Sequence, residues 1–332
     1  ELSGRIDTLT PPKCMSPGGD RLQFNGTSWF CVCEPYWSGK TCETLPPWSQ
    51  QEKLVGSDRT SKIYFGSSVS ISGDYAVIGA PFDYHSYAKG AAYVFVRSGT
   101  TWTQQQKLTA SEWVNNNLFG YSVSISGDYI VVGAPGTDSA YIFVRSGDTW
   151  TQQQKINGQN GGSFGSSVSI SGDYAVVGAH NDGSGFRGSA YVFVRSGELW
   201  TQQQQLTASD AGNQDYFGYS VSISGEYAIL GALGDDDGVG DSGAAYVFKR
   251  SGTTWTEQQK LKASDGEMAD YFGWSVSISG DYAVIGAYLH NEKDNDSGAA
   301  YVFKRSESTW AQEQKLTASD GAIGDQFGYS VS

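Results

Sequence analysis

The stretch that decides the fold is FGSSVSISGDYAVIGAP, residues 65–81. Its first eight residues alternate between apolar and polar side chains, which is the pattern of a half-buried β-strand. Ser72-Gly73-Asp74 predicts a tight hairpin turn, because glycine readily supplies the positive φ that such a turn needs. Residues 75–80 are apolar almost throughout and predict a second strand that is buried on both faces.

Two further strands complete the unit. After a variable loop, residues 91–97 predict a third strand, and a Gln-rich stretch from Trp102 to Leu108 predicts a fourth. We interpret this polar fourth strand as an exposed edge strand that is able to pair laterally with another molecule. No segment shows the 3.6-residue periodicity of an amphipathic helix, so an all-β fold is expected.

The unit is repeated along the chain. Phe-Gly recurs roughly every 50 residues, and each of its first five copies is followed by Gly-Ala; the copies begin at Phe65, Phe119, Phe164, Phe217, Phe272 and Phe327. A sheet that is apolar on both faces must stack against neighbours, so the repeats predict a β-propeller of four-stranded antiparallel blades. Five full repeats and partial ones are present, and six or seven blades are expected if the chain continues past Ser332.

Residues 48–332 resemble FG-GAP repeats, the family of integrin α-subunit propellers and of many secreted microbial proteins. Phe65-Gly66 and Gly79-Ala80-Pro81 carry the resemblance. Integrin-type repeats place an acidic calcium loop between these two elements, whereas this chain has only a two-residue hairpin there. We therefore expect turn capping instead of calcium binding at the acidic residue of each hairpin, namely Asp74, Asp128, Asp173, Glu226 and Asp281.

The cysteines define a small first module. Cys14, Cys31, Cys33 and Cys42 are clustered in a Gly- and Pro-containing stretch, which predicts disulfides made in an oxidising compartment. A zinc site of four thiolates is the alternative, although the Cys-x-Cys spacing is unusual for one. Residues 13–43 resemble the C-terminal half of an EGF-like domain, and this resemblance implies the pairs Cys33–Cys42 and Cys14–Cys31.

The predicted organisation is an N-terminal extension (1–12), the reduced EGF-like module (13–43), a Pro-rich linker (44–50) and the propeller (48–332), which is incomplete at its C-terminus. Asn25 and Asn295 begin glycosylation sequons. The formal net charge is −13, from 22 basic and 35 acidic residues, so a nucleic-acid partner is not expected. No apolar run reaches the length of a membrane span, and the cysteines favour an extracellular or cell-surface location.

The loops from the second to the third strand, and those between blades, vary from copy to copy and form the candidate binding face. It carries Trp113, His85, His180 and His290; the histidines lie on three different blades, and we interpret them as solvated. Asp235, Asp237 and Asp241 form a candidate cation site, for which calcium fits the oxygen ligands, with a solvated acidic loop as the alternative. No other cofactor is expected.

Motifs for nucleophilic, metal-dependent or phosphate-binding catalysis are not recognised in the repeats. We therefore predict a secreted, non-enzymatic structural or adhesive glycoprotein, a subunit of an extracellular filament or cell-surface coat. It would self-associate or bind an extracellular protein or glycan. The alternatives are a glycan- or protein-binding module that uses the variable face, and a propeller enzyme with a site in the central channel.

Overall fold

The computed structural model describes residues 21–24, 29–32, 52–58, 64–82, 89–112, 114–159, 161–236, 240–291 and 296–332. The chain divides into two compact units, Glu1–Lys53 and Leu54–Ser332. In the first unit, β1 (Arg21–Phe24) pairs with β2 (Trp29–Val32) in an antiparallel hairpin. The cysteine side chains and both sequon asparagines lie outside the described residues, so the disulfides, the EGF-like module and the glycosylation sites stay predictions.

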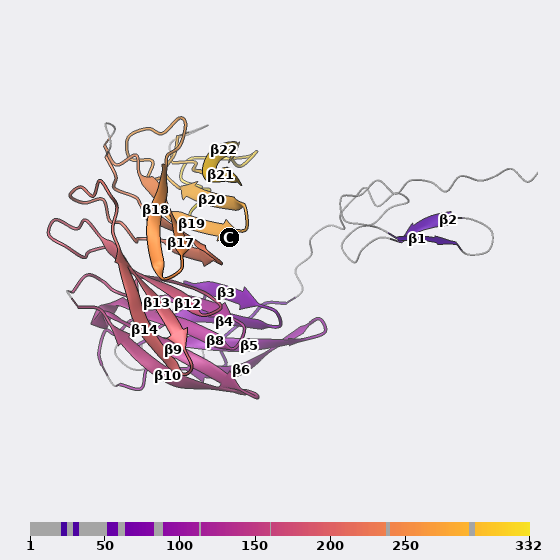
Figure 1. The fold of residues 1–332 in the computed structure, drawn as a ribbon. Helices are drawn as coiled ribbons and strands as arrows, with labels where there is room; N and C mark the ends of the chain where they lie inside the picture. Colours follow the sequence, from indigo (N-terminus) through magenta and orange to yellow (C-terminus); the bar gives the residue numbers. More distant parts are fainter. Residues whose placement is uncertain are drawn as a thin grey trace, which may run out of the picture. The chain divides into compact units, whose positions relative to one another are not determined.

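The second unit contains five four-stranded antiparallel sheets, one for each full repeat (Figure 1). In chain order the strands are β3 (Val69–Ser72), β4 (Tyr75–Ala80), β5 (Ala91–Ser98) and β6 (Thr101–Leu108); β7 (Ser122–Ser126), β8 (Tyr129–Ala134), β9 (Ser139–Ser146) and β10 (Thr149–Asn157); β11 (Ser167–Ser171), β12 (Tyr174–Ala179), β13 (Ser189–Ser196) and β14 (Leu199–Leu206); β15 (Val221–Ser224), β16 (Tyr227–Ala232), β17 (Ala244–Ser251) and β18 (Thr254–Leu261); β19 (Ser275–Ser279), β20 (Tyr282–Ala287), β21 (Ala299–Ser306) and β22 (Thr309–Leu316). A short 3₁₀ turn, η2 (Pro135–Thr137), follows β8.

The sheets fan out from their first strands. β3, β7, β11, β15 and β19 contact one another in succession, whereas the fourth strands of neighbouring sheets touch only sparsely. Sheets that are close at one edge and spread at the other are the blades of a propeller. The prediction of an all-β, four-stranded blade architecture is therefore confirmed. No helix in the described part of the chain is long and apolar enough to span a membrane.

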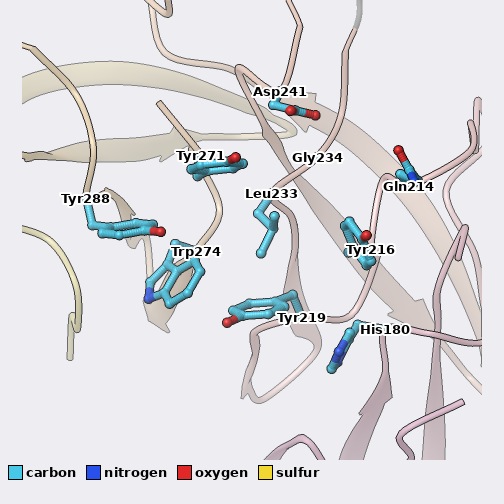
Figure 2. Close-up of a pocket in the computed structure, with 10 residues that line it drawn as sticks. All are labelled: His180, Gln214, Tyr216, Tyr219, Leu233, Gly234, Asp241, Tyr271, Trp274 and Tyr288. Atoms are coloured by element: carbon cyan, nitrogen blue, oxygen red, sulfur yellow. The ribbon is translucent and has the colours of Figure 1, made fainter. Parts of the chain in front are cut away.

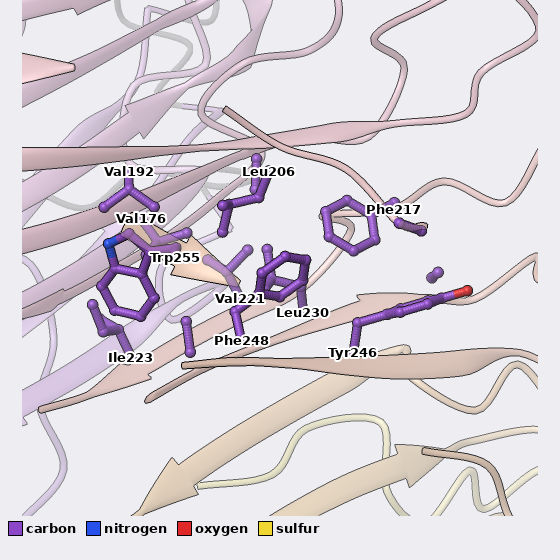
Figure 3. Close-up of a cluster of buried hydrophobic side chains, with 14 of the residues drawn as sticks. Val176, Val192, Leu206, Phe217, Val221, Ile223, Leu230, Tyr246, Phe248 and Trp255 are labelled. Carbon is purple, nitrogen blue, oxygen red and sulfur yellow. The ribbon is translucent and has the colours of Figure 1, made fainter. Parts of the chain in front are cut away.

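The hydrophobic core lies between the blades. One such layer, shown in Figure 3, joins Val176 and Val192 of the third blade to Val221, Ile223 and Trp255 of the fourth. Equivalent layers separate the other successive blades. Because both faces of an inner sheet are apolar, each blade buries its side chains only when a neighbour stands on either side.

The Phe-Gly and Gly-Ala elements lock one blade to the next. Ser167 Oγ donates a hydrogen bond of 2.8 Å to the carbonyl oxygen of Gly218, in the following Phe-Gly. That carbonyl lies so close to Gly178 that a Cβ there would be 2.1 Å from the oxygen. The same serine-to-glycine bond joins each of the other successive repeats, from Ser68, Ser122, Ser220 and Ser275. The repeat motif is therefore an interface between blades.

The glutamines of the fourth strands form a second link between blades. Gln204 accepts a hydrogen bond of 2.8 Å from the main-chain N–H of Trp255 and donates one of 2.7 Å to its carbonyl. The Trp255 indole N–H donates to Gln203 at 3.1 Å. The same arrangement joins Gln106 to Trp150, Gln154 to Trp200 and Gln259 to Trp310. The fourth strand lies at the edge of each sheet, as predicted, and these Gln side chains are engaged with the next blade. Lateral pairing of this edge with another molecule stays a prediction.

The acidic residues of the hairpin turns pair with the third strand. Asp74 accepts hydrogen bonds from the Arg97 guanidinium, with a closest N–O distance of 2.8 Å. Matching ion pairs join the corresponding residues of the other blades, Asp128–Arg145, Asp173–Arg195, Glu226–Arg250 and Asp281–Arg305. These carboxylates therefore tie the turn between the first and second strands of each blade to its third strand. The sequence predicted turn capping at these positions.

Two isoleucines at the same repeat position provide a matched test of inter-blade packing. Ile125 is 5% exposed between blades, whereas Ile71 of the first blade is 65% exposed. We expect Ile125→Ala to lower the free energy of unfolding by about 2–5 kcal/mol. Ile71→Ala should change it by less than about 0.5–1 kcal/mol. Urea unfolding followed by tryptophan fluorescence measures both, and equal losses would contradict the blade-stacking account.

Candidate functional site

A cavity of about 370 Å³ opens among the third, fourth and fifth blades (Figure 2). Its size falls in the usual range for small-molecule pockets, which is about 300–1,000 Å³. It is lined by His180, Gln214, Tyr216, Tyr219, Leu233, Gly234, Asp241, Tyr271, Trp274 and Tyr288. These residues come from the ends of second strands, from the loops that follow and from the inter-blade turns, so the cavity lies on the variable loop face.

The repeat itself delivers the aromatic side chains. In each inter-blade turn, the residue before Phe-Gly and the residue after it are brought together by a four-residue turn. At the fourth blade the N–H of Tyr219 donates to the carbonyl of Tyr216 at 3.0 Å, and Tyr216 takes a left-handed φ of 55°. The fifth blade repeats this geometry with Tyr271 and Trp274. One turn therefore contributes two aromatic residues to the cavity.

The aromatic rings form a continuous wall. Trp274 lies at its centre, with ring-centroid distances of 4.2 Å to Tyr288, 4.7 Å to Tyr219 and 5.3 Å to Tyr329. Figure 2 shows Trp274 and Tyr288 at one end of the pocket and Tyr216 at the other, with Tyr219 between them. Flat aromatic faces of this kind bind the apolar surface of a ligand, and tyrosine hydroxyls add polar contacts.

His180 lies at the end of this wall, beside a serine. Its ring is 5.2 Å from that of Tyr219, and its Nδ1 is 2.9 Å from Ser166 Oγ. The main-chain N–H of Gly165 donates to the carbonyl of Gly178, which holds the two strand ends together. Burial lowers the pKa of His180 to about 4, so the imidazole is neutral near pH 7. A hydroxyl paired with a neutral imidazole is an arrangement used in hydrolytic catalysis.

The remaining groups of the pocket are uncharged apart from one carboxylate. Burial raises the pKa of Tyr219, and neighbouring tyrosines raise it further, so its hydroxyl keeps its proton. Burial likewise raises the pKa of Tyr288. Asp241 is exposed at the rim, and neither lysine nor arginine is among the lining residues. The described lining residues thus offer hydrogen-bond donors and apolar faces, and none of them carries a positive charge.

A second cavity, of about 260 Å³, shares His180 with the first. Its walls include Leu118, Tyr121, Pro135 and Ser166, which occupy corresponding or adjacent repeat positions in the second and third blades. His180 therefore separates two hollows on the same loop face.

The predicted site residues are not gathered in one place. Trp113, His85 and Asp237 lie outside the described residues. His180 contributes to the pocket, and Asp241 lies at its rim. Across the described ranges, no group of three or more His, Cys, Asp or Glu side chains is arranged to hold a metal ion, and the cation site stays a prediction.

His290 and Asp235 have structural partners. His290 is 3% exposed, with Nδ1 2.7 Å from an Asp270 carboxylate oxygen and Nε2 2.8 Å from the Lys315 ammonium. The bond to Asp270 raises the pKa of His290, and burial opposes it. Asp235 is 2% exposed and accepts a hydrogen bond of 2.6 Å from the Tyr246 hydroxyl. The interpretation of these histidines as solvated is wrong for His290, and for the partly buried His180, because loop length does not reveal how deeply a side chain packs.

Ser166 and the aromatic wall were not predicted from the sequence. A usable signal was present in the repeats. The residue after Phe-Gly is aromatic in four of the six copies and serine in two, as Ser67 in the first blade and Ser166 in the third. The residue after Gly-Ala changes to His180 in that same blade. The combination of serine at the first position with histidine at the second occurs only in the third blade among the five full repeats.

Fold and site together define a β-propeller with an aromatic pocket on its loop face. The FG-GAP repeat family model matches residues 48–95, 102–143, 150–193, 200–248, 255–303 and 310–332. The chain therefore belongs to the FG-GAP repeat family. A search of curated proteins found no match.

Solved structures share the fold at low sequence identity. A protein from Lactobacillus plantarum matches with a TM-score of 0.54 at 12% identity, over 76% of this chain and 71% of its own. A candidate 6-phosphogluconolactonase from Bacteroides uniformis matches with 0.56 at 12%, over 76% and 72%. The periplasmic gluconolactonase of Pseudomonas aeruginosa matches with 0.52 at 16%, over 77% and 71%. At such identities the similarity shows the fold alone.

These neighbours correct the functional prediction. The sequence predicted a non-enzymatic structural or adhesive protein, with a binding module as the alternative, because no catalytic motif is apparent in the repeats. Two of the solved propellers that share this fold are named as lactonases, which contradicts that expectation. The sequence prediction considered only motifs within single segments, whereas Ser166 and His180 belong to two separate repeat positions.

Proposed function

We propose that the protein is a hydrolase that opens cyclic esters in the pocket between the third and fifth blades. The observation that carries this proposal is the neutral His180 imidazole, 2.9 Å from Ser166 Oγ at the end of an aromatic wall. The lactonase names of two structural neighbours support the reaction class. The acidic net charge does not oppose it, because a lactone is uncharged.

In the proposed reaction, His180 is the general base. With the Nδ1 hydrogen donated to Ser166 Oγ, Nε2 keeps its lone pair and accepts a proton from water. The water oxygen forms a bond to the lactone carbonyl carbon, and the protonated Tyr219 hydroxyl donates to the developing oxyanion. The ring C–O bond then breaks, and the proton on Nε2 passes to the leaving alkoxide. The product is an open-chain hydroxy acid.

We propose a site of action outside the cytoplasm. The resemblance of residues 13–43 to an EGF-like module and the expected disulfides support this location. The named location of the Pseudomonas neighbour, the periplasm, is in agreement with it.

The proposal predicts lactone turnover by the full chain. Purified protein mixed with D-glucono-1,5-lactone should release acid faster than buffer alone, and the excess rate should be proportional to protein concentration. A pH indicator in weak buffer at pH 6 measures this release, with heat-denatured protein as the control. Rates equal to buffer across five- and six-membered sugar lactones and simple aliphatic lactones would overturn the proposed function.

A further inference from the structure

The walls of the pocket carry information about the substrate beyond the bond that is broken. Three aromatic rings line this part of the pocket. The ring centroid of Trp274 lies 4.2 Å from that of Tyr288 and 4.7 Å from that of Tyr219. A pyranose ring has C–H groups on its faces and hydroxyls around its edge. Aromatic rings bind the C–H faces of such a sugar. Phenol, amide and carboxylate groups such as those of Tyr271, Gln214 and Asp241 bind its hydroxyls.

The charge of the pocket selects against a phosphorylated sugar. Proteins bind phosphate with arginine, lysine or the N–H groups of a helix N-terminus. Among the residues that the structure describes, neither lysine nor arginine lines either cavity that contains His180. The described part of the second unit contains no α-helix that could supply such a terminus. Asp241 at the rim adds a negative charge, and like charges placed together weaken binding.

We propose that the pocket binds an unphosphorylated pyranose lactone and discriminates against its 6-phosphate. This inference rests on the proposed function and specifies its substrate. It separates the two kinds of lactonase named among the structural neighbours, since one name specifies a phosphorylated sugar acid and the other does not. In this assignment Trp274 stacks on the ring, and Asp241 is the residue that opposes a phosphate.

Binding can be measured independently of turnover with a lactam, in which nitrogen replaces the ring oxygen and resists hydrolysis. The probes are D-glucono-1,5-lactam and its 6-phosphate, titrated into the full chain by isothermal calorimetry. We expect the neutral lactam to bind at least about tenfold more tightly than the phosphate. Comparable affinities, or tighter binding of the phosphate, would overturn the inference.

Two variants localise the discrimination. Trp274→Ala should weaken binding of the neutral lactam by about fivefold to tenfold, the loss of one aromatic contact. Asp241→Asn should strengthen binding of the phosphate by about twofold to fivefold. Asparagine tolerates the left-handed φ of 52° at this position, and a gain in affinity cannot come from misfolding. An Asp241→Asn variant without this gain contradicts the assigned role of Asp241.

The two proposals fail in different ways. If the protein binds the neutral lactam selectively but turns over no lactone, the inferred ligand class stands and the proposed function is wrong. If the protein hydrolyses lactones but binds both lactams equally, the proposed function stands and the inferred discrimination against phosphate is wrong. If the protein binds neither lactam, the inference is also wrong, whether or not lactones are turned over.

Discussion

Replacing His180 with glutamine is expected to reduce lactone turnover at least about 100-fold, the usual contribution of a general base. Glutamine keeps polar atoms near Ser166 but cannot accept a proton from water. The imidazole is partly buried against Tyr219, and glutamine is close to it in size, so the fold should be retained. The excess rate of acid release at pH 6 measures the effect, and circular dichroism checks the fold.

A matched control lies on the same blade. Leu199 is 57% exposed at the start of β14, at the opposite end of the blade from His180. Leu199→Gln should therefore leave turnover within about twofold of the unsubstituted protein. If His180→Gln retained full turnover while the neutral lactam still bound, His180 would not be the base.

The pH dependence has a definite sign. Burial lowers the pKa of His180 to about 4, so the base is already unprotonated above about pH 5. Turnover should not change through protonation of His180 between pH 6 and 8, and should fall as the pH drops through 4. An unperturbed histidine would instead lose activity below about pH 6.5. A profile with its midpoint near 6.5 would contradict a buried, neutral His180.

Stability must be followed over the same range, because the same shift acts on folding. A histidine with a folded-state pKa below its unfolded value binds more protons when unfolded. Its contribution to stability is complete above about pH 6.5 and is progressively lost as the pH falls toward 4. Initial rates taken within the folded range, checked by urea unfolding at each pH, separate the loss of the base from the loss of the fold.

The fold could be predicted from the sequence because the signals are local and repeated. Alternating residues, the Ser-Gly-Asp hairpin and the apolar second strand of residues 65–81 each specify one element. Repetition then requires the sheets to stack. By contrast, the Ser166–His180 pair depends on which strand ends lie side by side, and the partial burial of His180 depends on the neighbouring Tyr219. Those relations are properties of packing and are absent from any single repeat.

The spacing of Phe-Gly and Gly-Ala is visible in the sequence, but its physical reason is not. The contact between Gly178 and the carbonyl of Gly218 supplies that reason, because only glycine leaves room for the oxygen of the next blade. Gly133, Gly231 and Gly286 meet the following blade in the same way. The repeat signature therefore records a steric requirement at the blade interface, independent of whatever the loop face binds.

The steric requirement predicts that Gly178→Ala will be among the most damaging single substitutions in the chain. The added Cβ would lie 2.1 Å from the Gly218 oxygen and 2.1 Å from Ser167 Oγ. The blades would have to separate, which strains the core and breaks the buried Ser167–Gly218 bond. We expect a loss of about 3–5 kcal/mol in the free energy of unfolding, measured by urea denaturation.

Two further variants decide whether the loss comes from this contact. Ser167→Ala removes only the hydrogen bond and should cost about 1 kcal/mol. At Gly266 a Cβ would meet its nearest atoms at 3.6 Å, an ordinary contact, so Gly266→Ala should change stability by less than about 1 kcal/mol. The expected order of damage is Gly178→Ala, then Ser167→Ala, then Gly266→Ala. If Gly178→Ala were no worse than Gly266→Ala, the blades would have room at this interface, and the steric explanation of the repeat would be wrong.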